Sequence, residues 1–148
     1  SPSTQRGDKC VRMNGLDMMV FEPSTSLSAI ARQRLEYLYL RGNKLTGLWD
    51  FTQTPNLKLL DVSENELTDL GGVSDLEQLT HLYANTNLIE SPADVSDMPC
   101  LRVASLSSNS ISSLEGMARL PQLEALFLSS NSLESVVGLP PCPHLTTL

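Results

Sequence analysis

The apolar residues of this chain recur with a 22-residue period. Segments of eleven residues share one pattern, in which apolar residues occupy the first, fourth, sixth and eleventh positions and asparagine occupies the ninth. The five copies read LEYLYLRGNKL, LKLLDVSENEL, LTHLYANTNLI, LRVASLSSNSI and LEALFLSSNSL. Self-similarity at a fixed period of this length is typical of proteins built by stacking one structural unit.

The spacing within each copy predicts a short strand. In L-x-L the two leucines lie on one face and the residue between them on the other. A single copy cannot bury its leucines, but stacked copies bury a continuous core. We therefore predict an α/β repeat solenoid, in which a curved parallel sheet lines the concave side. Short helical turns are expected on the convex side, at Gly72–Gln78 and Glu115–Leu120.

The repeats divide the chain into three parts. Residues 35–144 hold the five copies, and residues 145–148 begin a sixth copy that stops after four residues. Residues 1–34 are expected to form an N-terminal cap or a degenerate first repeat. Because the chain starts at Ser1 and ends within a repeat, we expect it to be a piece of a longer protein.

The predicted register of the cap follows the same period. Apolar residues precede the leucines of the first full copy by one 22-residue period at Met13, Leu16 and Met18. Phe21 then stands where the later copies have asparagine. This alignment predicts that Gly15 and Asp17 point outward from the first strand.

The repeated asparagine is expected to be structural. Its side-chain amide can both donate to and accept from backbone groups left unpaired where the strand bends away. The five members of this predicted ladder are Asn43, Asn65, Asn87, Asn109 and Asn131.

A repeated proline completes the pattern, two residues before the opening leucine of most copies, at Pro55, Pro99, Pro121 and Pro143. Residues 35–148 thus resemble the leucine-rich repeats of the 22-residue subfamily. That subfamily is typified by the regulatory subunit of protein phosphatase 1 and includes an axonemal dynein light chain and the spliceosomal A-prime protein. The resemblance implies a role in phosphatase, microtubule-motor or ribonucleoprotein assemblies.

Function is expected at positions that the repeat leaves free, which are the outward residues of the strands. All three tyrosines of the chain lie there. We predict a protein-binding surface formed by Tyr37, Tyr39, Leu59, Asp61, His81, Tyr83, Val103 and Phe127. Tyrosine is a frequent interface anchor because its ring is large, amphipathic and has few rotors. The alternative is that these aromatic residues only cover neighbouring strands.

Charge suggests which partner would bind. Residues 1–58 carry eight basic and five acidic residues, whereas residues 59–148 carry two basic and twelve acidic residues, and the net charge is −7. Such a chain is a poor candidate for binding nucleic acid or an anionic membrane. We expect a protein partner, such as a helix, whose basic residue pairs with Asp61 and stacks on Tyr39 or Tyr83.

The cysteines and the apolar runs bear on the compartment. Cys10, Cys100 and Cys142 form no C-x-x-C motif, and there is no N-x-[ST] sequon. We therefore expect free thiols and a cytoplasmic protein, with nuclear or ciliary locations left open. No apolar run exceeds four residues, the length of Met18–Phe21, and such a run is too short to span a bilayer.

No feature of the sequence favours catalysis, a cofactor or a metal. His81 and His144 lie almost three repeats apart, and no phosphate-binding or zinc-protease motif occurs. We expect a non-catalytic interaction module. The alternatives are a regulatory arm of a larger kinase, phosphatase or GTPase, and a purely structural spacer. An uncapped C-terminal repeat can contact another copy of the chain end to end. The sequence therefore does not decide the oligomeric state.

Overall fold

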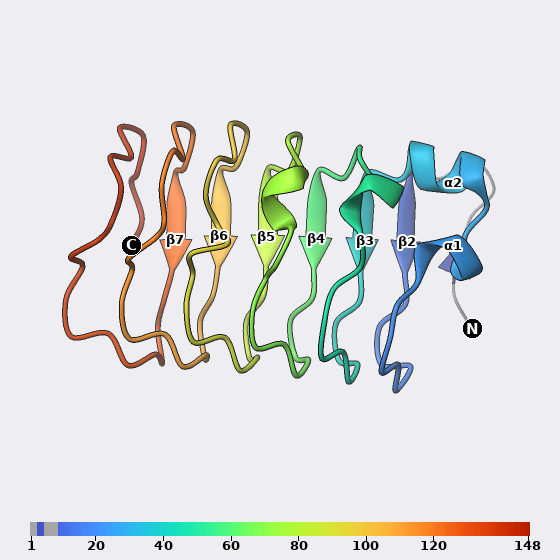
Figure 1. Cartoon of the computed structure of the whole chain (residues 1–148), viewed down its shortest axis with the longest axis horizontal. Helices are drawn as coiled ribbons and strands as arrows, with labels where there is room; N and C mark the ends of the chain where they lie inside the picture. Colours follow the sequence, from blue (N-terminus) through green and yellow to red (C-terminus); the bar gives the residue numbers. More distant parts are fainter. Residues whose placement is uncertain (1–2, 5–8) are drawn as a thin grey trace.

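The computed structural model describes residues 3–4 and 9–148 of the chain. Six short strands lie side by side in chain order and form one parallel sheet (Figure 1). They are β2 (Cys10–Arg12), β3 (Tyr37–Tyr39), β4 (Leu59–Asp61), β5 (His81–Tyr83), β6 (Val103–Ser105) and β7 (Ala125–Phe127). A further strand, β1 (Ser3–Thr4), pairs antiparallel with β2. The predicted α/β solenoid with a parallel sheet is confirmed.

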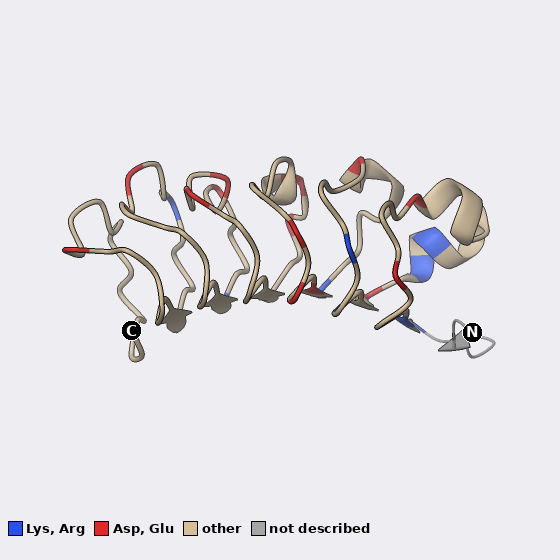
Figure 2. Cartoon of the chain, turned by 90° about the horizontal axis from the view of Figure 1, so that it is seen from below, with Lys and Arg blue, Asp and Glu red and all other residues tan. Residues whose placement is uncertain are grey.

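The strands lie along the inner side of a shallow arc (Figure 2). From β3 to β7 each strand pairs with the next at a constant 22-residue offset, so that Tyr37 lies beside Leu59 and Leu59 beside His81. The period read from the sequence is therefore the register of the sheet. Outward residues at the same repeat position form columns that run across the concave face.

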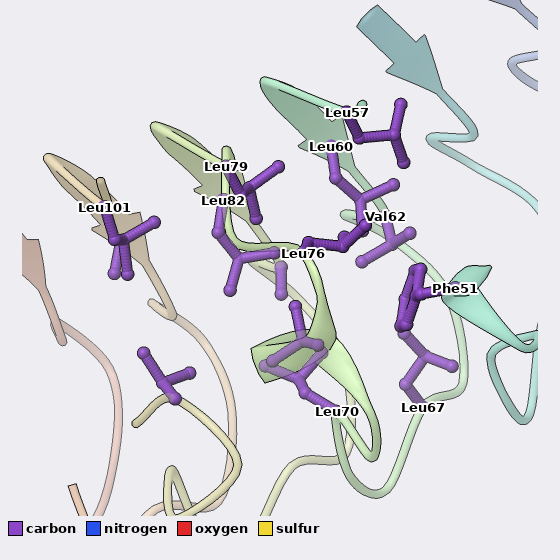
Figure 3. Close-up of a cluster of buried hydrophobic side chains, with 14 of the residues drawn as sticks. Phe51, Leu57, Leu60, Val62, Leu67, Leu70, Leu76, Leu79, Leu82 and Leu101 are labelled. Atoms are coloured by element: carbon purple, nitrogen blue, oxygen red, sulfur yellow. The ribbon is translucent and has the colours of Figure 1, made fainter. Parts of the chain in front are cut away.

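Leucines fill the space between the sheet and the convex loops. The middle residue of each strand from β3 to β7 points inward and is fully buried, at Leu38, Leu60, Leu82, Ala104 and Leu126. In the third and fourth turns of the solenoid, Leu60 and Leu82 share a cluster with Phe51, Leu70 and Leu76 of the convex segments (Figure 3). Burying one such side chain stabilises the fold by about 1.5–3 kcal/mol. The core is therefore made by the inward residues alone, and the outward residues are free of this role.

The repeated asparagines join consecutive turns of the solenoid. The side-chain Nδ2 of Asn87 donates to the carbonyl of Val62 in the preceding repeat (3.0 Å) and to that of Ala84 in its own (3.3 Å). Its Oδ1 accepts from the backbone N–H of Leu67 (3.0 Å). Asn43, Asn65, Asn109 and Asn131 make the corresponding bonds. Each amide thus satisfies backbone groups of two repeats at once.

Helical turns occur on only part of the convex side. Two 3-10 turns lie there, η1 (Phe51–Gln53) and η2 (Val73–Asp75), the second within the predicted Gly72–Gln78. The prediction of a helical turn at Glu115–Leu120 is wrong. This segment makes a tight turn and then pairs Ala118 with Ser96 of the preceding repeat. Arg119 has a positive φ value of 51°, and a right-handed turn cannot continue through a left-handed residue.

The N-terminal cap has a longer repeat than the constant period predicts. β2 pairs Val11 with Leu38, a 27-residue offset, so the expected 22-residue register of the cap is wrong. The five extra residues accommodate two helices, α1 (Pro23–Ser26) and α2 (Ala29–Arg34). In this register Leu16 takes the asparagine position.

Phe21 is buried instead of replacing the asparagine. Its ring packs edge-on against Trp49, with 4.9 Å between the ring centroids, and Trp49 packs on Phe51 at 4.8 Å. This aromatic cluster closes the N-terminal end of the core.

Within the described part of the chain, no helix is long and apolar enough to cross a membrane.

Candidate functional site

The concave face presents two columns of outward side chains. The first runs across the starts of the strands, through Tyr37, Leu59, His81 and Val103. The second runs across their ends, through Tyr39, Asp61, Tyr83, Ser105 and Phe127. The structure therefore brings all eight predicted surface residues onto one face. Seven of them are contiguous on strands β3–β6.

Phe127 stands apart from that group. It lies two strands from Tyr83, and the residue between them, Ser105, is buried. Tyr37 and Phe127 are 37% and 41% exposed, which makes them the most open aromatic side chains of the face. Tyr39 and Tyr83 are half-buried and flank Asp61.

An arginine that the sequence analysis missed belongs to this face. In the 27-residue register Arg12, and not Asp17, occupies the outward position beside Tyr39. Its guanidinium lies over the Tyr39 ring, 4.2 Å from the ring centroid. The signal was present in the sequence, since Val11 and Met13 alternate around Arg12 as the leucines of the later copies do. The expected stacking of a partner's guanidinium on Tyr39 must therefore compete with the chain's own Arg12.

Asp61 is the acidic centre of the face. One carboxylate oxygen accepts from the backbone N–H of Ser63 (3.0 Å), which holds the side chain in place. Burial and then the Asp61 carboxylate raise the pKa of the Tyr83 phenol. Tyr83 therefore stays a neutral hydroxyl that can donate to an acceptor. Along the same strand, the His81 ring lies near the Tyr83 ring, with 6.2 Å between the centroids.

Polar residues just beyond the strands are occupied by the scaffold. Oδ1 of Asn85 accepts from the Ser105 hydroxyl (2.7 Å) and from the backbone N–H of Ser107 (3.0 Å). The Ser63 hydroxyl accepts from the N–H of Asn85 (3.1 Å). These contacts connect neighbouring turns, so this column stabilises the concave face.

A column of charged residues, which the sequence analysis also missed, runs along the N-terminal ends of the strands. Glu36 bridges two lysines of adjacent turns, Lys9 at 3.0 Å and Lys58 at 3.3 Å. Lys9 and, to a lesser degree, Lys58 hold the pKa of the Glu36 carboxyl below its usual range. Arg102 and Glu124 pair at the same position two turns further on. Figure 2 shows basic residues concentrated toward the N-terminal end and acidic residues along the loops.

No group of three or more histidine, cysteine or acidic side chains converges on a point where a metal ion could sit in the described ranges. Nδ1 of His81 lies 2.9 Å from the hydroxyl of Thr80, the residue that directly precedes β5. The two columns offer aromatic area, the Asp61 carboxylate and the guanidinium of Arg12.

Comparison with known proteins identifies the repeat. Residues 33–89 match the family model described as leucine rich repeat. No curated protein matches the sequence. A leucine-rich-repeat protein of Leptospira interrogans is 22% identical and superposes with a TM-score of 0.69 over 93% of this chain. This chain spans only 41% of the length of that protein.

Two further structures share the fold. One belongs to the complex of BIR3 with SERK2 from Arabidopsis thaliana, with 20% identity and a TM-score of 0.63 over 90% of this chain and 72% of that one. The other is YopM from Yersinia enterocolitica, with 30% identity and a TM-score of 0.55 over 78% of this chain and 28% of that one. The repeat pattern, the solenoid and these matches together show that the chain has the leucine-rich-repeat fold.

Proposed function

We propose that the chain is a non-catalytic module that binds a protein partner on the concave face of its sheet. The observation that carries this proposal is the position of the tyrosines. Tyr37, Tyr39 and Tyr83 all project from the face opposite the core, in a chain that is only 5% aromatic. Buried aromatic anchors contribute much of the energy in protein interfaces.

The rigidity of the platform supports binding. Backbone hydrogen bonds, the asparagine amides and the polar column around Asn85 hold neighbouring turns together. A surface formed in advance loses little conformational entropy when a partner binds. The related fold seen in the BIR3–SERK2 complex occurs in an assembly of two proteins.

The proposed partner segment is a helix that brings a basic side chain to Asp61. Because Arg12 covers the Tyr39 ring, the open aromatic neighbour of Asp61 is Tyr83. A guanidinium could pair with the carboxylate and stack on Tyr83.

We propose the cytoplasm as the location, since the chain has three cysteines, all free in the structure, and no N-x-[ST] sequon.

Tyrosine replacement tests the proposal once a partner has been captured from an extract. Tyr39→Ala and Tyr83→Ala should each weaken binding by at least about 2 kcal/mol. Asp61→Asn should weaken it less and should lower its salt dependence, because the change removes one charge and keeps the shape. Calorimetric titration measures binding, and thermal melts establish that each variant is folded.

The matched control is Ser129→Ala, on the polar end of the same face, which should change binding little. A structural spacer would give the opposite pattern, in which the tyrosine variants lose stability and no partner is affected. A regulatory arm of a larger enzyme would bind a catalytic domain of its own parent chain. Use of that domain as the titrant distinguishes this case.

A further inference from the structure

The concave face holds one cation and one anion without ion-pair partners among the described residues. Arg12 is exposed and stacks on Tyr39, but no carboxylate within the described ranges pairs with it. Its neighbour Arg41 differs, because it pairs with Glu64 at 2.5 Å. Asp61 accepts only a backbone hydrogen bond through one oxygen and has no ion-pair partner there either.

The two charges have a defined order along the solenoid. Arg12 lies on β2, Tyr39 on β3 and Asp61 on β4, at matching register positions. Because neighbouring strands are about 4.8 Å apart and the guanidinium leans over Tyr39, we place the two charged groups about 5–10 Å apart. The cation lies nearer the N-terminal end of the solenoid.

We propose that the partner segment carries an acidic and a basic side chain one helical turn apart, the acidic one bound by Arg12 and the basic one by Asp61. The proposal rests on the proposed function and adds the chemistry and the orientation of the segment. Residues four apart on a helix are separated by about 6 Å along its axis, which falls within the separation of the two charges. The acidic residue must face the N-terminal repeat, since the reverse order would place like charges together.

Stacking prepares Arg12 for this task. The central carbon of the Arg12 guanidinium lies 4.2 Å from the Tyr39 ring centroid, and the planar fork of a guanidinium can donate two parallel hydrogen bonds to a carboxylate. The Tyr39 ring also restricts the side chain before the partner arrives. Lysine at this position would keep the charge but lose the two-point contact.

A displayed library of helical peptides tests the proposal and does not require that the natural partner be identified. The library has a fixed amphipathic scaffold and randomises the polar positions next to its apolar face. Selection against the unaltered chain should enrich peptides with Asp or Glu four positions from Arg or Lys, in one order only. Selection against Arg12→Gln should lose the acidic preference alone, and selection against Asp61→Asn the basic preference alone.

Synthesised binders then give the magnitudes. Arg12→Gln and Asp61→Asn should each weaken binding about two- to fivefold, as exposed ion pairs do, with Arg12→Lys in between. The controls are Arg34→Gln on α2 and Asp75→Asn on η2, which remove similar charges away from the concave face and should have no effect. Unchanged melting temperatures establish that all variants are folded.

The outcomes separate this proposal from the one it rests on. Binders that require Tyr83 but show no acid and base preference would overturn the charge-pair proposal and leave concave-face binding in place. If no peptide is enriched, or if Tyr83→Ala binds the enriched peptides as well as the unaltered chain does, both proposals fail. Binders with the reversed charge order would overturn the assigned orientation and with it the pairing of Arg12 with the acidic residue.

Discussion

At the scale of single residues, the asparagine amides show why one residue type recurs in every copy. The Asn87 side chain is buried, and its donors and acceptor connect Val62, Ala84 and Leu67 of two successive turns. Asparagine carries a donor and an acceptor on a short side chain, and aspartate lacks the donor. A change at this position therefore leaves backbone groups of two repeats without partners.

Asn87→Ala should lower the free energy of unfolding by about 1–3 kcal/mol, because buried backbone groups lose their hydrogen bonds. Urea unfolding measures the loss. Asn131 is the matched control, since it makes the same bonds at a partly exposed position where water can replace them. Asn131→Ala should lower the free energy of unfolding by less than Asn87→Ala does. An unchanged urea midpoint for Asn87→Ala would show that the ladder does not stabilise this repeat.

At the scale of elements, charged side chains connect the starts of three neighbouring strands. Glu36 precedes β3 and pairs with Lys9 before β2 and with Lys58 before β4. These three residues occupy one repeat position, so the ion pairs follow the strand register. Because Lys9 and Lys58 lower the pKa of Glu36 in the folded chain, its unfolded form binds a proton at a higher pH than its folded form does.

This difference makes the contribution of Glu36 depend on pH. The stabilisation should be complete above the unfolded pKa, near 4.5, and should disappear as the pH falls through the lower folded pKa. Glu36→Gln should therefore be less stable than the unaltered chain at neutral pH, and the two should converge in acid. Urea unfolding at a series of pH values measures both curves.

The control for this experiment is Glu77→Gln. Glu77 is exposed on the convex side and pairs with no cation within the described residues. Glu77→Gln and the unaltered chain should therefore have nearly the same free energy of unfolding at every pH. A gap between Glu36→Gln and the unaltered chain that persists unchanged in acid would contradict the ion-pair explanation.

At the scale of the whole molecule, stability should vary along the solenoid because each turn contacts only its neighbours. The central turns are covered on both sides, and their inward leucines, such as Leu60, Leu82 and Leu106, are fully buried. The last turn is open by comparison. Val136, Val137 and Leu148 are exposed, and residues 145–148 join the sheet through a single bridge between Ala125 and Thr147.

Hydrogen exchange should reveal this gradient. The amides of Thr146 and Thr147 bond to the carbonyl of Glu124 just as those of Arg102 and Val103 bond to that of Thr80. The geometry is matched, so the difference in exchange reports local opening. We expect Thr146 and Thr147 to exchange at least about tenfold faster, and the region 133–148 to exchange faster than 79–106. Equal protection would count against an open C-terminal end.

Much of the fold can be predicted from the sequence because the repeat makes it local. The leucine alternation around Tyr37, Leu59 and His81 indicated both the strand positions and the outward direction of these side chains. Since every copy has the same length, the columns of the concave face from Tyr39 to Phe127 followed without further information.

The N-terminal part of the site could not be predicted in the same way. A constant period assigned Asp17 to the face, whereas a 27-residue cap repeat brings Arg12 there. The length of that repeat depends on how α1 and α2 pack over the first full turn. The Phe21 ring contributes to this packing by its edge-on contact with Trp49. Periodicity does not report such packing.

Periodicity is sufficient to predict the solenoid, its inward leucines, the asparagine positions and the tyrosine-rich face, because each depends on alternation within a copy and on equal spacing between copies. Packing between turns was needed to establish that Arg12 stacks on Tyr39, that Glu36 joins two lysines, and that Glu115–Leu120 is not helical. These features depend on contacts between neighbouring turns and on the length of the cap repeat. Side chains that are one repeat apart in the sequence meet only after the chain has stacked.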